Sequence, residues 1–209
     1  MIYIFPFLLG MTLSLLGQLP LGTISLTATQ ISLQENFRSA WQYSIGVALV
    51  EMIYLRAVLA GMRWITRHQF IFNIFNWLAV LFFLLLGVLS FVAARRLEKK
   101  DQKTLILRTR LHRFFLGMGM SALNPAQIPF WFIWSAYFLN MGWLRLAPYS
   151  FNLFTLGSGL GTVGGLAIYM YGGNWMVSQM KTSNRTLNTL VGIIFVVAAL
   201  VQLVRMARS

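Results

Sequence analysis

The 209-residue sequence contains no cysteine and very little charge. Without cysteine the chain can form no disulfide, thiol nucleophile or thiolate metal site. Only 10% of the residues are charged, and just four of them are acidic. The two histidines, His68 and His112, both fall in predicted loops. We therefore expect no metal or other cofactor, and no hydrolase, because no histidine lies at membrane depth to activate a serine.

Apolar residues are abundant instead, at 58% of the sequence. A stretch of about 20 apolar residues crosses the hydrocarbon core of a bilayer. The sequence predicts an all-α polytopic membrane protein with six transmembrane helices at about 2–28, 41–62, 70–94, 114–139, 149–171 and 187–205. We expect the first to be a membrane helix rather than an export signal, because it lacks a basic start and a cleavage site. Residues 1–209 then form a single integral membrane domain with no soluble domain.

Basic residues are unevenly distributed. Seventeen Lys and Arg against four acids give a net charge of +13, and eight of the seventeen lie in the loop at about 95–113. Because basic residues concentrate in cytoplasmic loops, we expect this loop in the cytoplasm and both termini outside. A basic loop next to anionic lipid requires no other partner. Membrane lipid is thus an expected partner and nucleic acid is not.

The sequence contains an internal similarity. The stretch Leu9–Leu16 recurs as Leu116–Leu123, at an offset of 107 residues, and each copy leads into an apolar segment broken by proline. Chance similarity between two helices rich in Leu, Met and Gly is the alternative explanation. A duplication gives repeat one at about 1–95 and repeat two at about 114–209. With three helices in each, the halves enter the membrane from opposite sides, which makes a 3+3 inverted repeat with proline-broken helices 1 and 4.

The two breaks supply most of the candidate substrate residues. Proline removes a backbone donor, and interrupted membrane helices expose backbone only where they line a cavity. We expect the breaks to meet near the midplane, with Pro20 and Pro125 on opposite walls of one cavity. Kinked helices packed by small residues are the alternative. The candidates are Gln18, Pro20, Gly22, Thr23 and Ser25 at the first break, and Asn124, Pro125 and Gln127 at the second.

Glu51 is the sole acid inside a predicted membrane helix. A carboxylate there costs about 2.5–3.5 kcal/mol on insertion scales, so it should face the protein interior and mark function. It could bind and release a proton or pair with a cation. Tyr54 shares its helical face and joins the candidates. The alternative is a glutamate that only ties helices together. We expect Arg56, by contrast, to extend to the membrane interface.

Three stretches resemble the LysE-type translocator family, the lysine and homoserine/threonine exporters. They are Gln18-Leu19-Pro20-Leu21-Gly22-Thr23-Ile24-Ser25-Leu26, Ile45-Gly46-Val47-Ala48-Leu49-Val50-Glu51-Met52-Ile53-Tyr54 and Leu123-Asn124-Pro125-Ala126-Gln127-Ile128-Pro129-Phe130-Trp131. The family usually has Pro-Gly-Pro where this chain has Pro20-Leu21-Gly22. When the number and length of the predicted helices are added to these three stretches, the resemblance spans essentially the whole chain.

This resemblance implies a secondary transporter, not an enzyme, in the bacterial cytoplasmic (inner) membrane. It implies efflux of an amino acid or similar small solute, driven by the proton gradient or the membrane potential. The residues allow such a mechanism on their own, because helix N-termini after the breaks can attract a carboxylate while Glu51 can attract an ammonium group. Two rivals stay open, a structural or lipid-handling protein and an exporter of a different solute or cation. Assembly as a homo-oligomer also stays open.

Overall fold

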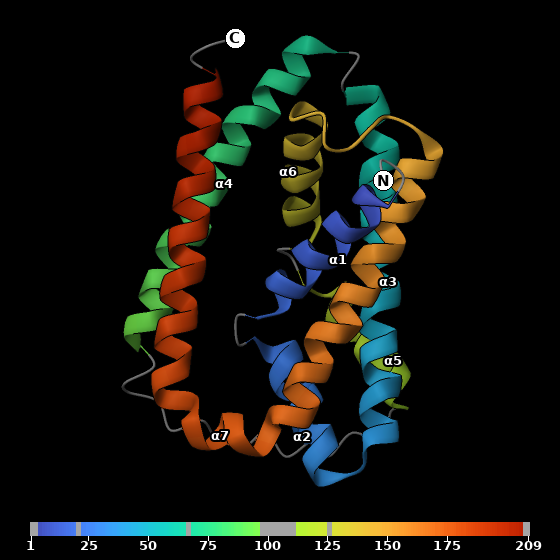
Figure 1. Cartoon of the computed structure of the whole chain (residues 1–209), viewed down its shortest axis with the longest axis vertical. Coiled ribbons are helices and arrows are strands. Elements are labelled where there is room, and N and C mark those ends of the chain that lie inside the picture. Colours follow the sequence, from blue (N-terminus) through green and yellow to red (C-terminus); the bar gives the residue numbers. More distant parts are fainter. Residues whose placement is uncertain (1–3, 20–21, 66–67, 97–111, 125–126, 207–209) are drawn as a thin grey trace.

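The computed structural model describes residues 4–19, 22–65, 68–96, 112–124 and 127–206. Within these ranges the ordered elements are all helices and no strand occurs, so the all-α prediction is confirmed there. Figure 1 shows the helices running mostly along the long axis of the molecule. They are α1 (Phe5–Gln18), α2 (Thr23–Gln34), α3 (Phe37–Ile65), α4 (Gln69–Arg96), α5 (Arg113–Ala122), α6 (Gln127–Asn140) and α7 (Pro148–Met206).

Both predicted helix breaks are present. The apolar segment predicted at 2–28 is divided into α1 and α2, which bend by 80° relative to each other (Figure 1). The segment predicted at 114–139 is likewise divided into α5 and α6. Pro20 and Pro125 themselves lie outside the described residues. Helix α2 continues to Gln34, beyond the predicted end, because no proline or glycine interrupts Thr23–Gln34.

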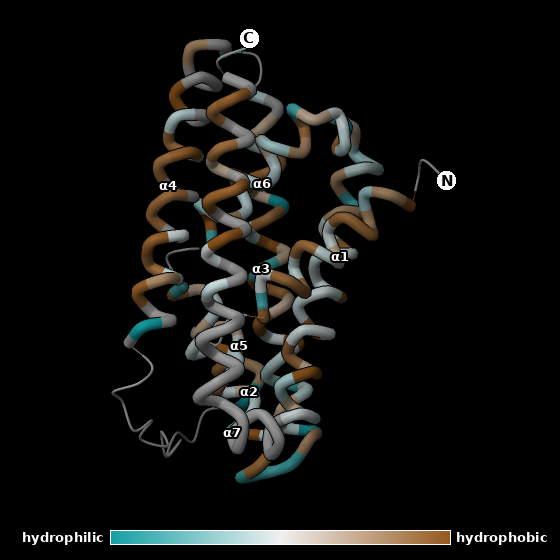
Figure 2. The backbone as a smooth tube through the Cα atoms, turned by 60° about the vertical axis from the view of Figure 1, so that its left-hand side comes forward, coloured by the Kyte–Doolittle hydropathy of each residue, from teal (hydrophilic) through white to brown (hydrophobic). Residues whose placement is uncertain are grey.

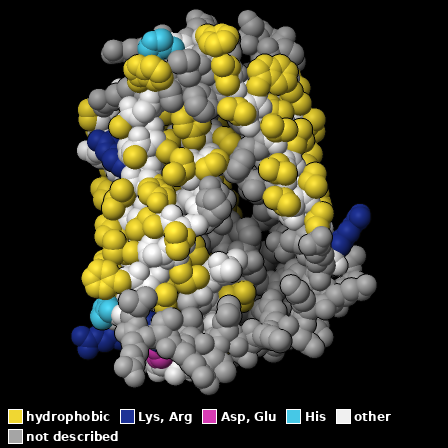
Figure 3. Space-filling model, turned by 180° about the vertical axis from the view of Figure 1, so that it is seen from behind, with side chains coloured by type: hydrophobic (Ala, Val, Ile, Leu, Met, Phe, Trp, Pro, Cys, Tyr) yellow, Lys and Arg dark blue, Asp and Glu magenta, His cyan; other side chains and the backbone are white. Residues whose placement is uncertain are grey.

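Helices α3 and α4 agree closely with the predicted segments at 41–62 and 70–94. Both expose large apolar side chains at helical spacing, and Figures 2 and 3 show hydrophobic residues along α4 and over the face seen from behind. A contiguous exposed apolar surface of this kind fits contact with lipid. The exposed residues include Ile45, Leu49 and Ile53 on α3 and Trp77, Leu81, Leu85 and Leu89 on α4.

The last two predicted helices, 149–171 and 187–205, are parts of one 59-residue element, α7. The loop predicted between them is therefore wrong. No proline follows Pro148 in this element, so the backbone ladder continues where a loop was expected. Figure 1 shows α7 descending, turning at the bottom of the picture and rising again beside α4. Its final segment packs on α4 where Gly192 meets the ring of Phe91.

By length and composition, two stretches of the described chain can each cross a membrane, Phe37–Met62 and Pro148–Gly172. The bent pair of α1 and α2 makes a third if it counts as one span. Six spans and an inverted repeat therefore remain predictions.

Five glycines allow two pairs of helices to cross in backbone contact. On α1 and α7, a Cβ added at Gly10 would overlap the carbonyl oxygen of Phe154. One at Gly157 or Gly161 would overlap the carbonyl oxygen of Phe7 or Met11, respectively. On α3 and α5, a Cβ at Gly46 would overlap the carbonyl oxygen of Phe114, and one at Gly117 would overlap that of Tyr43. Small residues are the common means by which membrane helices approach this closely. The crossings fix α1 on α7 and α5 on α3.

Candidate functional site

Glu51 lies near the middle of α3, and only 4% of its surface is exposed. Its carboxylate accepts three side-chain hydrogen bonds. Ser14 Oγ donates to Oε1 at 3.1 Å, Gln18 Nε2 donates to Oε2 at 3.3 Å, and Thr162 Oγ1 is 2.7 Å from Oε2. The hydroxyls of Ser14 and Thr162 are also 2.6 Å apart. One carboxylate therefore joins α1, α3 and α7.

The positions of these partners follow from helix spacing. Ser14 and Gln18 lie four residues apart on α1, so their side chains share one face of the helix. Gly10, one turn earlier on that face, lets α1 approach the backbone of α7. Thr162 lies one turn beyond Ser158, whose carbonyl oxygen is 3.0 Å from the threonine Oγ1 and is the alternative acceptor for its one proton. The close α1–α7 crossing thus carries both sets of hydroxyls to Glu51.

A second polar cluster lies at the break between α5 and α6. Ser121 Oγ donates to the carbonyl oxygen of Val47 at 3.2 Å, and Gln127 Nε2 donates to Ser121 Oγ at 3.1 Å. Val47 lies one helical turn before Glu51 on α3. The backbone of Asn124 bridges this break, since its N–H bonds to the Ser121 carbonyl and its own carbonyl accepts from Gln127. The second break is therefore adjacent to the Glu51 site.

The ends of the two breaks also approach each other. A Cβ at Gly17, near the end of α1, would lie 3.2 Å from the ring of Phe130 in the first turn of α6. This is one contact between the two broken segments, and their meeting around one cavity near the midplane remains a prediction. The walls that Pro20 and Pro125 were predicted to form lie outside the described part of the chain.

Other predicted site residues contact backbone freed by the breaks. Ser25 Oγ donates to the carbonyl of Gln18 at 3.4 Å, and the Tyr54 hydroxyl donates to that of Ala122 at 3.1 Å. The Tyr169 hydroxyl, which sequence reasoning did not single out, donates to the carbonyl of Leu19. Gly22 and Thr23 lie exposed at the start of α2. In this arrangement Ser25 and Tyr54 satisfy backbone groups rather than Glu51.

Sequence reasoning missed Ser14, Thr162 and Trp131 as neighbours of Glu51. The side chain of Trp131, on α6, interacts with the same carboxylate. A signal for Ser14 was present, because it aligns with Ser121 in the internal similarity of the sequence. Nothing in the local sequence identifies Thr162, which lies 111 residues from Glu51.

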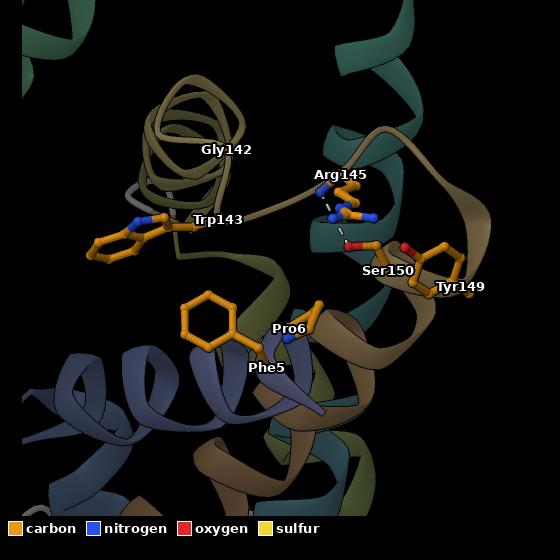
Figure 4. Close-up of a pocket in the computed structure, with 7 residues that line it drawn as sticks. All are labelled: Phe5, Pro6, Gly142, Trp143, Arg145, Tyr149 and Ser150. Atoms are coloured by element: carbon orange, nitrogen blue, oxygen red, sulfur yellow. Dashed lines mark hydrogen bonds between the residues drawn. The ribbon is translucent and has the colours of Figure 1, made fainter. Parts of the chain in front are cut away.

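A separate surface pocket of about 300 Å³ lies where α1 and α7 begin, beside the loop after α6. In Figure 4 the Arg145 backbone approaches the hydroxyl of Ser150, and its N–H donates to that oxygen at 3.3 Å. Aromatic rings of Phe5, Trp143 and Tyr149 line the same pocket. None of the predicted site residues lines it. An arginine among aromatic rings is typical of a membrane interface.

The surroundings of the Glu51 carboxylate suit the binding of one cation or one proton. Its hydrogen-bond donors, Ser14, Gln18 and Thr162, are all neutral side chains. The other acid in the described ranges, Glu35, is paired with Arg113 across α2 and α5. No group of three or more potential metal ligands occurs among the residues that the structure describes. A carboxylate held by neutral donors can exchange a proton or bind a cation without displacing a counter-ion.

Comparison with known proteins gives one match. No curated protein and no solved structure matches this chain. The model of the LysE type translocator family matches residues 15–206, a range that includes both breaks, Glu51 and Thr162. With nearly the whole sequence covered, the chain belongs to the LysE type translocator family.

Proposed function

We propose that this protein is a secondary transporter that exports amino acids or similar zwitterionic or cationic solutes, driven by the proton gradient or the membrane potential. Family membership makes it a multi-pass membrane protein that translocates a small solute. The observation that carries the finer proposal is the buried Glu51 carboxylate, held by neutral donors from α1 and α7. An acid at that depth is costly to insert, and function is the usual reason for its presence.

The contacts also support an inverted repeat. In a two-fold symmetric arrangement, each contact between a residue of one repeat and a residue of the other is matched by a second contact between their two counterparts. Four of the five glycine contacts follow this rule, with an offset of 107 for the first helix of each repeat and 111 for the second. The fifth, between Gly161 and Met11, has valine, Val50, at the position that corresponds to its glycine. The related pairs are Gly10 and Gly117, Phe7 and Phe114, Gly46 and Gly157, and Tyr43 and Phe154.

A hydrogen bond between Glu51 and Thr162 supports the same proposal. Thr162 lies 111 residues after Glu51, so in the proposed repeat the two are counterparts and their bond lies on its axis. Binding at the interface of two repeats near the membrane midplane is the usual arrangement in such transporters. We infer that the repeats rock about this pair, and that a substrate ammonium group or a proton exchanges at Glu51.

Efflux from loaded vesicles tests the proposal. Proteoliposomes containing the protein are loaded with radiolabelled amino acids, one at a time, and release is followed with and without a pH gradient. We expect release of at least one amino acid to exceed that from protein-free vesicles and to respond to the gradient. Release of none, combined with accelerated transbilayer movement of a fluorescent lipid, would favour the lipid-handling rival.

The distribution of basic residues gives a prediction about topology. A cysteine introduced at Lys100 should react with an impermeant maleimide only from the cytoplasmic side, and cysteines at Met1 and Ser209 only from outside. The chain has no native cysteine, so each variant reports one position. All three positions lie outside the described residues. Labelling of Ser209 from the cytoplasm would contradict six spans and the symmetric repeat.

Thr162→Val should weaken the site without removing its charge. Valine has nearly the same shape but cannot donate to Glu51, so we expect slower efflux and a loss of about 1–3 kcal/mol in stability. Thermal unfolding in detergent and vesicle efflux measure the two effects. Thr155→Val is the matched control, because that buried hydroxyl bonds only to the Phe151 carbonyl of its own helix. Equal effects of the two substitutions would show that the Thr162–Glu51 bond has no special role.

A further inference from the structure

The loop between α6 and α7 is held in place by hydrogen bonds and packing. Gly142 has a φ of 71°, the left-handed conformation that commonly ends a helix, here α6. The backbone N–H groups of Trp143 and Leu144 then both donate to the carbonyl oxygen of Phe138, at 2.9 and 3.0 Å. Leu144 is buried in the apolar core. The loop therefore presents the next residue, Arg145, in a defined position.

The ring of Trp143 is also held from two sides. It stacks on Phe138 of α6 with centroids 5.9 Å apart, and it meets Phe5 of α1 edge-on at 6.2 Å. Nearly half of the surface of Trp143 and of Phe5 stays exposed, and both residues line the surface pocket of about 300 Å³. In Figure 4 these two rings lie on one side of the pocket, and Arg145 and Tyr149 lie on the other. A volume of this size suits a small organic molecule.

Arg145 supplies the positive charge of the pocket. Its backbone N–H donates to the buried hydroxyl of Ser150 at 3.3 Å, and the residue is otherwise exposed. The acids in the described ranges are Glu35, paired with Arg113, and Glu51, bonded to neutral donors. No acid within these ranges therefore pairs with Arg145. A guanidinium group of this kind suits a carboxylate, and neighbouring aromatic ring faces attract an ammonium group.

The pocket is separate from the Glu51 site but lies on helices that also reach that site. Ser150 precedes Thr162 by about 18 Å along α7, at 1.5 Å per residue. Between them, α1 crosses α7 in backbone contact where Gly10 meets Phe154. Figure 1 places the starts of α1 and α7 opposite the end where α2 finishes and α3 begins. On the predicted orientation, with the N-terminus outside, the pocket lies at the outer end.

We propose that this pocket is an exit site, which binds the exported amino acid at the outer end after it leaves Glu51. The carboxylate of the amino acid pairs with the guanidinium group of Arg145. Its ammonium group and side chain lie against the rings of Trp143 and Phe5. Because Glu51 attracts the ammonium group and Arg145 the carboxylate, the two sites hold opposite charges of the same zwitterion. This inference rests on the proposed function.

The fluorine resonance of Trp143 tests binding directly. The full chain, labelled with 5-fluorotryptophan, is placed in nanodiscs of phosphatidylcholine, and Trp143 is assigned with Trp143→Phe. The common amino acids are then added one at a time. We expect at least one to shift the resonance saturably, and its carboxamide, which lacks the carboxylate, to bind about tenfold more weakly.

Arginine variants show whether the charge of Arg145 is responsible. Arg145→Gln should weaken binding of that amino acid about tenfold, because a charge-assisted hydrogen bond is lost. Arg145→Lys should weaken it less, since the charge remains. Arg56→Gln is the matched control and should bind normally, because Arg56 is an exposed arginine on α3 that does not line the pocket.

Three results would overturn the exit site. The first is that no amino acid shifts the Trp143 resonance, and the second is that Arg145→Gln binds as tightly as the wild-type chain. The third is a shift that appears only when phosphatidylglycerol is added to the nanodiscs, because the pocket would then hold the headgroup of an anionic lipid.

Competition from outside tests the place of this site in transport. The vesicles are ones in which labelling of Lys100→Cys shows the basic loop inside. Unlabelled amino acid added outside should slow release of the radiolabelled one. Arg145→Gln should raise several-fold the external concentration that halves release, and leave unchanged the internal concentration that half-saturates it. An unchanged external concentration would contradict an exit site.

The two proposals can fail separately. Efflux from wild-type vesicles without a shift of the Trp143 resonance would overturn the exit site and leave the proposed function standing. A saturable Trp143 shift without efflux of any amino acid would count against the proposed function, and the pocket would then be a binding site that serves no export.

Discussion

Glu51→Gln should reduce gradient-driven efflux to the level of protein-free vesicles while leaving the protein folded. Glutamine keeps the size of the side chain and can still hydrogen-bond Ser14 and Thr162, whose hydroxyls are each able to accept or donate. It cannot carry a negative charge or exchange a proton. An interaction that depends on the charge of the carboxylate is therefore lost, whereas the packing of α1, α3 and α7 is kept.

Vesicle efflux with and without a pH gradient measures this effect, and circular dichroism with thermal unfolding confirms the fold. Glu51→Asp should retain part of the activity, because the charge remains but lies about one methylene farther from its partners. Glu35→Gln is the matched control, since Glu35 is paired with Arg113 away from the site. If Glu51→Gln exports at the wild-type rate with unchanged pH dependence, Glu51 is only a structural tie.

Gly117→Ala should destabilise the protein strongly, whereas Gly119→Ala should not, although the two glycines lie two residues apart on α5. A Cβ at Gly117 would overlap the backbone carbonyl of Tyr43, and backbone cannot move aside as a flexible side chain can. Overpacking costs roughly 1–3 kcal/mol, and this contact belongs at the upper end or above. A Cβ at Gly119 meets nothing within 4 Å, and alanine favours the helix by about 0.5–1 kcal/mol.

The midpoint of thermal unfolding in detergent, with the yield of monodisperse protein, measures this difference. The proposed repeat adds a second requirement, because Gly10 is the counterpart of Gly117 and meets the carbonyl of Phe154 on α7. Gly10→Ala should therefore lower the midpoint about as much as Gly117→Ala. A neutral result for Gly10→Ala would contradict the symmetric crossing of the two repeats.

The sequence alone determined the features that depend on neighbouring residues. Apolar runs indicated helices α3 and α4, and the proline-containing segments indicated the breaks that separate α1 from α2 and α5 from α6. The isolation of Glu51 in an apolar helix indicated that it would be buried, and it is. These predictions succeeded because hydropathy, helix breaking and the cost of burying a charge are local properties of the chain.

The tertiary structure decided which side chains meet. Thr162 reaches Glu51 because glycines let α1 and α7 cross in backbone contact, and a crossing point is not encoded near either residue. For the same reason Ser25 and Tyr54, chosen for their positions, bond to backbone carbonyls at the breaks instead of to Glu51. The continuity of α7 was also unexpected, because polar residues suggested a loop where the chain has no proline to stop the helix. Such contacts are selected by close packing between helices that are far apart in the sequence. The order of residue types along the chain does not specify how those helices pack.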